Sequence, residues 1–161
     1  MITSAHTAYK PIDFDPFAGP AIEQLAPITE PQAELWLACQ FGGNDANRAY
    51  NESISVRLHG QLDRAAFEWA TGALVERHQA LRSAFSGDGK TILIFRDMAV
   101  PLTYDDLSEL ADAEKQILGA NHLNEDVLYL FDLQNGPLIR TGLLKLSETE
   151  HLFVLTAHHI V

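Results

Sequence analysis

The sequence predicts a single domain of the α+β class. Its 161 residues are enough for one domain with a buried core and too few for two. Hydrophobic residues make up 47% of the chain and charged residues 20%, proportions typical of a folded globular protein. Helical and extended patterns follow one another without strict alternation, which favours an α+β arrangement over a doubly wound parallel sheet.

Residues 1–26 are expected to form a linker or leader, because they contain several prolines and no sustained apolar periodicity. Their beginning lacks both the basic stretch and the continuous apolar run of a secretion signal. No apolar run in the chain approaches the ~20 residues needed to cross a bilayer. We therefore expect a cytoplasmic protein without a membrane partner.

A helix is predicted over residues 27–41. Thr29 and Gln32 have the spacing of a capping box, and an apolar stripe follows them. The Gly42-Gly43 pair predicts the end of this helix. Cys39 lies on the apolar stripe, so we interpret it as a small buried hydrophobe rather than a nucleophile.

The remaining elements follow from changes of periodicity. Residues 51–60 alternate apolar and polar side chains, as in a half-buried strand. Asp63 is expected to cap a helix over residues 63–78. The later elements are predicted as a hairpin over 80–95 with its turn at 86–90, a short strand at 100–107, one bent helix across 108–130, and two closing strands at 136–146 and 151–161 with a turn at 147–150.

Charge and composition exclude several classes of function. The formal net charge is −11, and the 11 basic residues are scattered, so a nucleic-acid partner is not expected. A single cysteine rules out an intrachain disulfide framework and a cysteine-rich zinc site. The glycines at 86–90 have neither the spacing nor the setting of a phosphate loop, and no G-x-S-x-G elbow is present.

The adjacent His158 and His159 are the most suggestive residues for chemistry. On a strand their side chains point to opposite faces, so the two cannot ligate one metal ion. A neutral imidazole at the end of a buried strand is suited to general base catalysis near neutral pH. The residues alone leave two readings open: a catalytic histidine, or two satisfied core or edge histidines.

Four stretches in order resemble the condensation domains of non-ribosomal peptide synthetases. The helix sequence ITEPQAELWLACQF at 28–41 is similar to the opening motif of that family. RHQALRSAF at 77–85 fits the pattern R-H-x-x-L-R-x-x-F at every fixed position. FDLQNGPLIR at 131–140 fits F-D-L-x-x-G-P-L-x-R, and AHHIV at 157–161 falls where the family carries H-H-x-x-x-D-G.

The resemblance implies an α+β lobe like that of chloramphenicol acetyltransferase, with a mixed sheet and helices packed on one side. In such domains two lobes enclose a tunnel, and amide bonds form between an acyl donor and an aminoacyl acceptor. Both substrates arrive as thioesters on the phosphopantetheine arms of carrier proteins. The resemblance therefore implies two carrier-protein partners, no directly bound cofactor and no metal.

The resemblance also assigns roles to particular residues. The second histidine of the family motif faces the tunnel and assists attack of the amine, which implies a catalytic role for His159. The first histidine, His158, is expected to be mainly structural. The supporting motif residues, for which we expect structural roles, are Arg77, Arg82, Asp132 and Arg140.

Residues 27–161 correspond to the N-terminal lobe of such a domain, and the aspartate and glycine of the histidine motif would fall just past Val161. We therefore expect a longer chain that supplies a second, C-terminal lobe. Alternatives are an epimerisation domain, another acyltransferase of the same fold, or a non-catalytic docking half-domain. The motifs at 28–41 and 77–85 favour condensation, and the stretch from Leu35 to Ser53 resembles condensation domains that follow polyketide modules.

Overall fold

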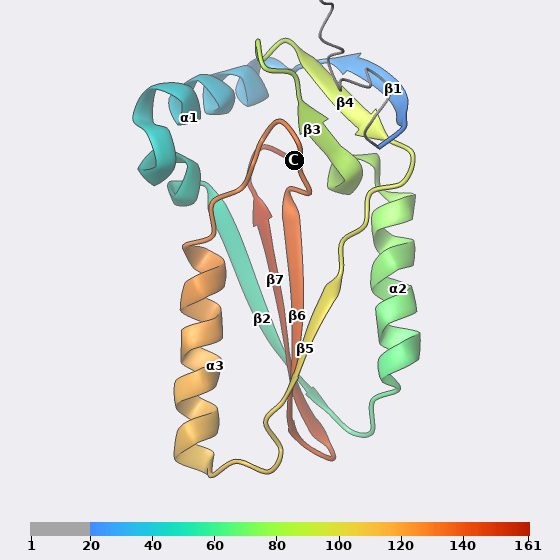
Figure 1. Cartoon of the computed structure of the whole chain (residues 1–161), viewed down its shortest axis with the longest axis vertical. Coiled ribbons are helices and arrows are strands. Elements are labelled where there is room, and N and C mark those ends of the chain that lie inside the picture. The colour runs from blue at the N-terminus through green and yellow to red at the C-terminus, as the bar shows by residue number, and fades with distance from the viewer. Residues whose placement is uncertain (1–19) are drawn as a thin grey trace, which may run out of the picture.

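The computed structural model describes residues 20–161, which form two sheets and three helices (Figure 1). A four-stranded sheet has the order β2-β7-β6-β5, and a three-stranded sheet has the order β1-β4-β3. The elements are β1 (Ile22–Pro27), α1 (Glu30–Ala49), β2 (Asn51–His59), α2 (Arg64–Arg77), a 3-10 turn (Gln79–Arg82), β3 (Ser83–Phe85), β4 (Thr91–Phe95), β5 (Leu102–Asp106), α3 (Asp112–Val127), β6 (Ile139–Ser147) and β7 (Glu150–His158).

The four-stranded sheet is mixed, as the family resemblance implies. Strand β7 is antiparallel to both β2 and β6, whereas β5 is parallel to β6. The parallel pair requires a crossover connection, and α3 provides it between β5 and β6. The two closing strands and the turn between them are confirmed.

Helices cover both faces of this sheet, and the expectation that they pack on one side is wrong. On one face Leu123 of α3 packs against Leu144, Leu152 and Val154. On the other face the ring of Phe67 from α2 meets the ring of Phe153 at a centroid distance of 5.1 Å. The physical reason is that neighbouring residues of β7 are apolar on both sides, so each side needs a cover.

Strand β1 (Ile22–Pro27) overlaps the end of residues 1–26, the segment expected to be a linker. Residues 22–27 pair antiparallel with β4 and form one edge of the small sheet. Ile22 and Leu25 remain exposed, so this strand carries no buried apolar period that the sequence could reveal. Residues 1–19 of the expected linker lie outside the described residues.

The sequence predicts that helix α1 ends at the glycine pair, but this prediction is wrong. The helix bends there and continues to Ala49. Gly43 has a φ of 65° inside the helix, a conformation that glycine adopts at little cost. The helix resumes after the bend because Asn47 donates to the carbonyl of Phe131 (3.1 Å) and accepts from its N–H (3.2 Å). The bend lets the last part of α1 pack over the chain that leads into β6.

The other differences concern element ends. Helix α3 is shorter than the expected span 108–130, because Asp106 accepts hydrogen bonds from Ser108 and holds a turn there. In the hairpin only Ser83–Phe85 is extended before the turn, and the residues before it form the 3-10 turn. Within residues 20–161 the structure contains no helix long and apolar enough to traverse a bilayer.

Candidate active site at the end of strand β7

Strand β7, which ends at His158, has its end at the upper edge of the four-stranded sheet, near the C-terminus (Figure 1). Strand β7 ends at His158, which is opposite Asn51 of β2. The side chain of His158 is fully buried, whereas that of His159 is exposed. The structure thus places the two adjacent imidazoles in different environments.

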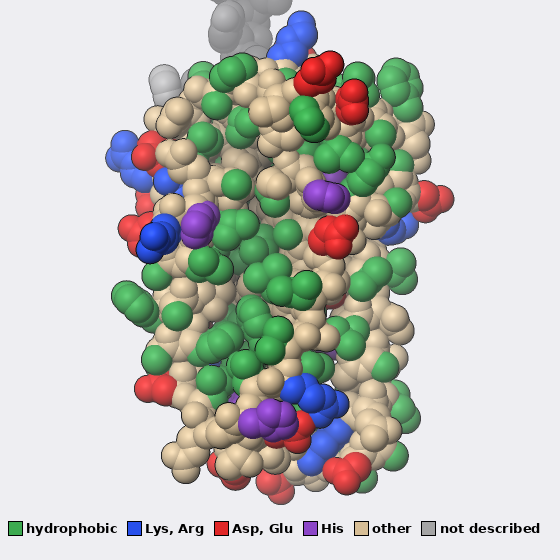
Figure 2. Space-filling model, turned by 180° about the vertical axis from the view of Figure 1, so that it is seen from behind, with side chains coloured by type: hydrophobic (Ala, Val, Ile, Leu, Met, Phe, Trp, Pro, Cys, Tyr) green, Lys and Arg blue, Asp and Glu red, His purple; other side chains and the backbone are tan. Residues whose placement is uncertain are grey.

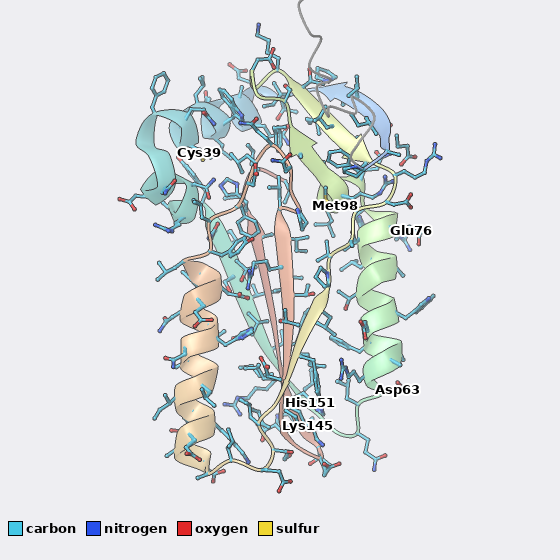
Figure 3. All side chains as sticks on the ribbon, in the orientation of Figure 1. Cys39, Asp63, Glu76, Met98, Lys145 and His151 are labelled. Atoms are coloured by element: carbon cyan, nitrogen blue, oxygen red, sulfur yellow. The ribbon has the colours of Figure 1, made fainter. Side chains whose placement is uncertain are left out.

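The imidazole of His158 lies in an apolar pocket. Its Nε2 is 3.8 Å from the Sγ of Cys39, and Figure 3 shows Cys39 on the side of α1 that faces the sheet. The rings of Tyr50 and Phe131 approach it edge-on, each at a centroid distance of 6.1 Å. Burial lowers the pKa of His158 from 6.5 to about 4, so the ring is uncharged at neutral pH. Cys39 is itself buried, and burial raises the pKa of its thiol.

The uncharged ring of His158 accepts a hydrogen bond from the turn that follows it. Its Nδ1 accepts a hydrogen bond from the backbone N–H of Ile160 at 3.3 Å. A neutral imidazole that accepts at Nδ1 carries its proton at Nε2, which faces Cys39. The carbonyl of His158 in turn accepts from the N–H of Val161 at 3.2 Å, so residues 158–161 form a tight turn around the buried ring.

The backbone of His159 is bound, and its side chain makes no hydrogen bond to the other described residues. Its N–H donates to the carbonyl of Tyr50 at 2.8 Å, which extends the pairing between β2 and β7 by one bond. Strand β7 ends at His158, but this bond continues the pairing by one residue, so the alternation of the strand, carried one residue further, puts His159 on the face of Ala157. An exposed imidazole on a fixed backbone can accept a proton from a bound molecule or donate one to it.

The face that carries Ala157 is only partly covered. Ile54 and Val56 of β2 pair with Leu155 and Phe153 of β7 on this face, and they are 57% and 45% exposed. Seen from behind, hydrophobic side chains gather along the middle of the molecule, over the region of the sheet (Figure 2). We call the side chains of Ile54, Val56, Phe153, Leu155 and Ala157 the open face.

Gln32 contacts this turn from the first turn of α1, and the sequence does not predict that contact. Its Nε2 donates to the carbonyl of Ile160 at 2.9 Å. Its Oε1 accepts from the N–H of Thr29 at 3.2 Å and from the Thr29 hydroxyl at 2.8 Å. The capping-box spacing predicts the two contacts with Thr29. Nothing local in the sequence predicts the contact with Ile160, which is 128 residues away.

The two arginines of the second motif lie away from this turn. Arg82 is buried, pairs with Glu23 and donates to the carbonyls of Phe95 and Glu76, so it joins β1, β4 and α2. Arg77 is exposed at the end of α2. Among the described residues, no hydrogen bond or ion pair connects either arginine to the histidines.

Asp132 and Arg140 organise the chain between α3 and β6. Asp132 accepts hydrogen bonds from the Asn135 side chain (2.7 Å) and from the N–H groups of Gln134 and Asn135, and these bonds lower its pKa. Arg140 pairs at 3.0 Å with Asp126, whose carboxylate is buried at the end of α3. Arg140 therefore lies on the face of the sheet that α3 covers, opposite to the open face.

The titratable side chains of residues 20–161 form no cluster of three or more His, Cys, Asp or Glu that could hold a metal ion. His158 also has no free ring nitrogen on the open face, because Nδ1 is occupied by Ile160 and Nε2 faces Cys39. The exposed His159 is therefore the ring that can meet a ligand at this end of β7.

Known proteins match the chain along most of its length. The family model described as "Condensation domain" matches residues 22–161. Tyrocidine synthase 3 of Brevibacillus parabrevis is 35% identical over 158 residues, which are 97% of this chain and 2% of that protein. Gramicidin S synthase 2 of Brevibacillus brevis is 31% identical over 137 residues, 84% of this chain and 3% of that protein. The chain thus spans a small fraction of the length of these relatives.

Solved structures match in the same region. The starter condensation domain of the rhizomide synthetase RzmA superposes with a TM-score of 0.75 at 27% identity, over 85% of this chain and 33% of that chain. A mutant of it in complex with C8-CoA and Leu-SNAC gives a TM-score of 0.75 at 26% identity, over 84% of this chain and 31% of that chain. The condensation domain of the Monacolin K polyketide synthase MokA, at 21% identity and a TM-score of 0.69, shares the fold.

Proposed function

The chain belongs to the condensation-domain family, and we propose on that basis that it supplies the N-terminal part of an amide-forming catalytic domain. The donor would be an acyl group and the acceptor an aminoacyl group, each carried as a thioester by a carrier protein. The observation that carries this proposal is the separation of the histidine pair. His158 is buried and uncharged, and His159 is exposed at the end of the strand that carries the open face.

The proposed reaction needs one well-placed imidazole. The amine nitrogen of the acceptor attacks the carbonyl carbon of the donor thioester, so a C–N bond forms and a tetrahedral intermediate results. The intermediate collapses with cleavage of the C–S bond, and overall one proton passes from nitrogen to the departing sulfur. His159 accepts a hydrogen bond from the attacking amine, which orients its lone pair, and it can carry the proton during the collapse.

Substrate class and partners are part of the same proposal. The chain covers 33% of the RzmA domain, so a C-terminal lobe would supply the opposite wall of the site. The RzmA complex with C8-CoA and Leu-SNAC supports an acyl donor and an aminoacyl acceptor here. No bound cofactor takes part in this scheme, since the phosphopantetheine arms belong to the donor and acceptor carrier proteins. We propose the cytoplasm as the compartment, and the unpaired thiol of Cys39 suits its reducing conditions.

The test uses the intact condensation domain with its second lobe. The domain is mixed with an acyl-loaded donor carrier protein and an aminoacyl-loaded acceptor carrier protein. Intact-protein mass spectrometry follows the mass of the acceptor. In the wild type we expect the mass of the acceptor to increase by the mass of the acyl group. The control variant His59→Ala, which changes an exposed histidine at the other end of β2, should give the same increase. His159→Ala should give none.

Three results would contradict the proposal. Full product formation by His159→Ala would remove the catalytic role of this residue. Inversion of the acceptor α-carbon without amide formation would instead identify an epimerisation domain. A domain that binds both loaded carriers and changes neither would be a docking module.

A further inference from the structure

We propose that Gln32 is a positioning residue for His159, on the premise that His159 serves the reaction proposed above. Gln32 lies in α1, far from the histidines in sequence, and touches neither imidazole by a hydrogen bond. It acts through the backbone of Ile160, the residue that follows His159.

The orientation of the Gln32 amide is determined by its neighbours. Its Oε1 is occupied by two donors from Thr29, the backbone N–H at 3.2 Å and the hydroxyl at 2.8 Å. The amide nitrogen must therefore point away from Thr29, and it meets the carbonyl of Ile160 at 2.9 Å. A carbonyl is an acceptor only, so the reverse orientation of the amide would place two acceptors against each other.

The backbone around His159 is held on both sides. Before it, the His159 N–H is bound to the carbonyl of Tyr50 at 2.8 Å. After it, Ile160 is fixed through its carbonyl by Gln32, through its N–H by Nδ1 of His158, and through its fully buried side chain. Of these restraints, the bond from Gln32 comes from the most distant part of the sequence.

The consequence for His159 is geometric. Within residues 20–161 the side chain of His159 is exposed, so in this part of the chain its direction depends on the backbone that carries it. A displacement of about 1 Å in a catalytic group can cost about 10²-fold in rate. Loss of the Gln32 bond frees the Ile160 carbonyl and loosens the peptide next to the imidazole.

The alternative is that Gln32 merely caps α1, and the two roles use different atoms. Capping uses Oε1, and positioning uses Nε2. Gln32→Glu keeps an acceptor for Thr29 and places a negative charge at a helix N-terminus, where it is favourable. It also replaces the donor to Ile160 with an oxygen, which repels the carbonyl. The substitution therefore preserves the cap and removes the bond to the turn.

The experiment compares Gln32→Glu and Gln32→Ala in the intact condensation domain. The matched control is Gln40→Ala, an exposed glutamine on the same helix. For both Gln32 variants we expect kcat for amide formation to fall about 10- to 100-fold, with KM for each carrier substrate unchanged. For Gln32→Glu we expect this fall at an unchanged melting temperature. Gln40→Ala should behave as the wild type.

A second readout needs no substrate. In protein labelled at its histidine rings, the imidazole resonances of His159 should shift in Gln32→Glu and not in Gln40→Ala. Wild-type kcat in Gln32→Glu would overturn the positioning role and leave capping alone. Unshifted His159 resonances would overturn it as well. If His159→Ala still forms the amide, the proposed function fails, whereas the resonance shift still decides whether Gln32 controls His159.

Discussion

At the scale of single residues, the site depends on two imidazoles that occupy opposite environments. His158 is enclosed by Cys39, Tyr50 and Phe131 and uses Nδ1 to accept from the Ile160 N–H. His159 has its backbone bound and its ring exposed. The strand pattern predicted opposite faces for the pair, but it could not tell which face is closed, because the covering groups come from α1 and the chain around Phe131.

His158 makes stability depend on pH in a specific direction. Its pKa of about 4 in the folded state lies below the ordinary value of 6.5, so the unfolded chain binds a proton that the folded chain does not. The free energy of unfolding therefore falls as the pH drops below about 6.5, and the loss is complete below about 4. Between pH 7.5 and pH 5 we expect a loss of about 2 kcal/mol from this group.

The variant His158→Asn keeps an acceptor for the Ile160 N–H and cannot titrate. Urea unfolding of the intact domain at several pH values should give a flatter curve for this variant than for the wild type. The comparison cancels the titration of carboxylates, which both proteins share. Parallel curves would mean that His158 is accessible to protons in the folded state.

We expect Arg140 to stabilise the fold, because its ion-pair partner Asp126 is buried. Arg140→Met would leave the Asp126 carboxylate unpaired at 3% side-chain exposure. Since Arg140 itself is partly exposed, we expect a loss of about 2 to 3 kcal/mol in the free energy of unfolding. Arg57→Met is the control, because it breaks the surface pair with Glu150 and should cost under about 1 kcal/mol. Equal losses in chemical unfolding would show that the burial of Asp126 has no energetic effect.

At the scale of elements, local signals predicted most helices and strands, and long-range pairing explains the errors. The period of two at 51–60, the cap at Asp63 and the turn at 86–90 are local signals. The structure contains the strand, the helix and the hairpin that they predict. Strand β1 was missed because its identity comes from pairing with β4. The continuation of α1 past Gly43 was missed because Asn47 binds Phe131 across 84 residues.

The bend of α1 gives a test at a glycine. Gly43→Ala places a side chain at a φ of 65°, which should lower the free energy of unfolding by about 1 kcal/mol. Gly72→Ala in α2 is the control, because this glycine is helical and its added Cβ meets no atom within 4 Å. It should raise stability by about 0.5 to 1 kcal/mol. Changes of opposite sign in the free energy of unfolding of the two variants, measured by thermal unfolding, would support the bend. A stabilising effect of Gly43→Ala would contradict it.

At the scale of the whole molecule, the proposed function makes the chain one wall of a larger site. The described residues spread from the covered face under α3 to the open face beside His159, and they span about a third of the RzmA domain. Sequence motifs predicted the family and the order of the site residues along the chain. They could not predict that Gln32 and His158 hold the same turn, because that contact exists only after α1 has packed over the end of the sheet.

The single-turnover rate of amide formation in the intact domain tests the central claim most directly. Wild type, His159→Ala and His158→Asn are each mixed with loaded donor and acceptor carrier proteins at pH 7. The account predicts a fall of about 10²-fold or more for His159→Ala, typical of a lost acid–base group, at unchanged stability. It predicts a smaller fall for His158→Asn. A His159→Ala rate equal to that of the wild type would contradict the assignment of chemistry to the exposed histidine.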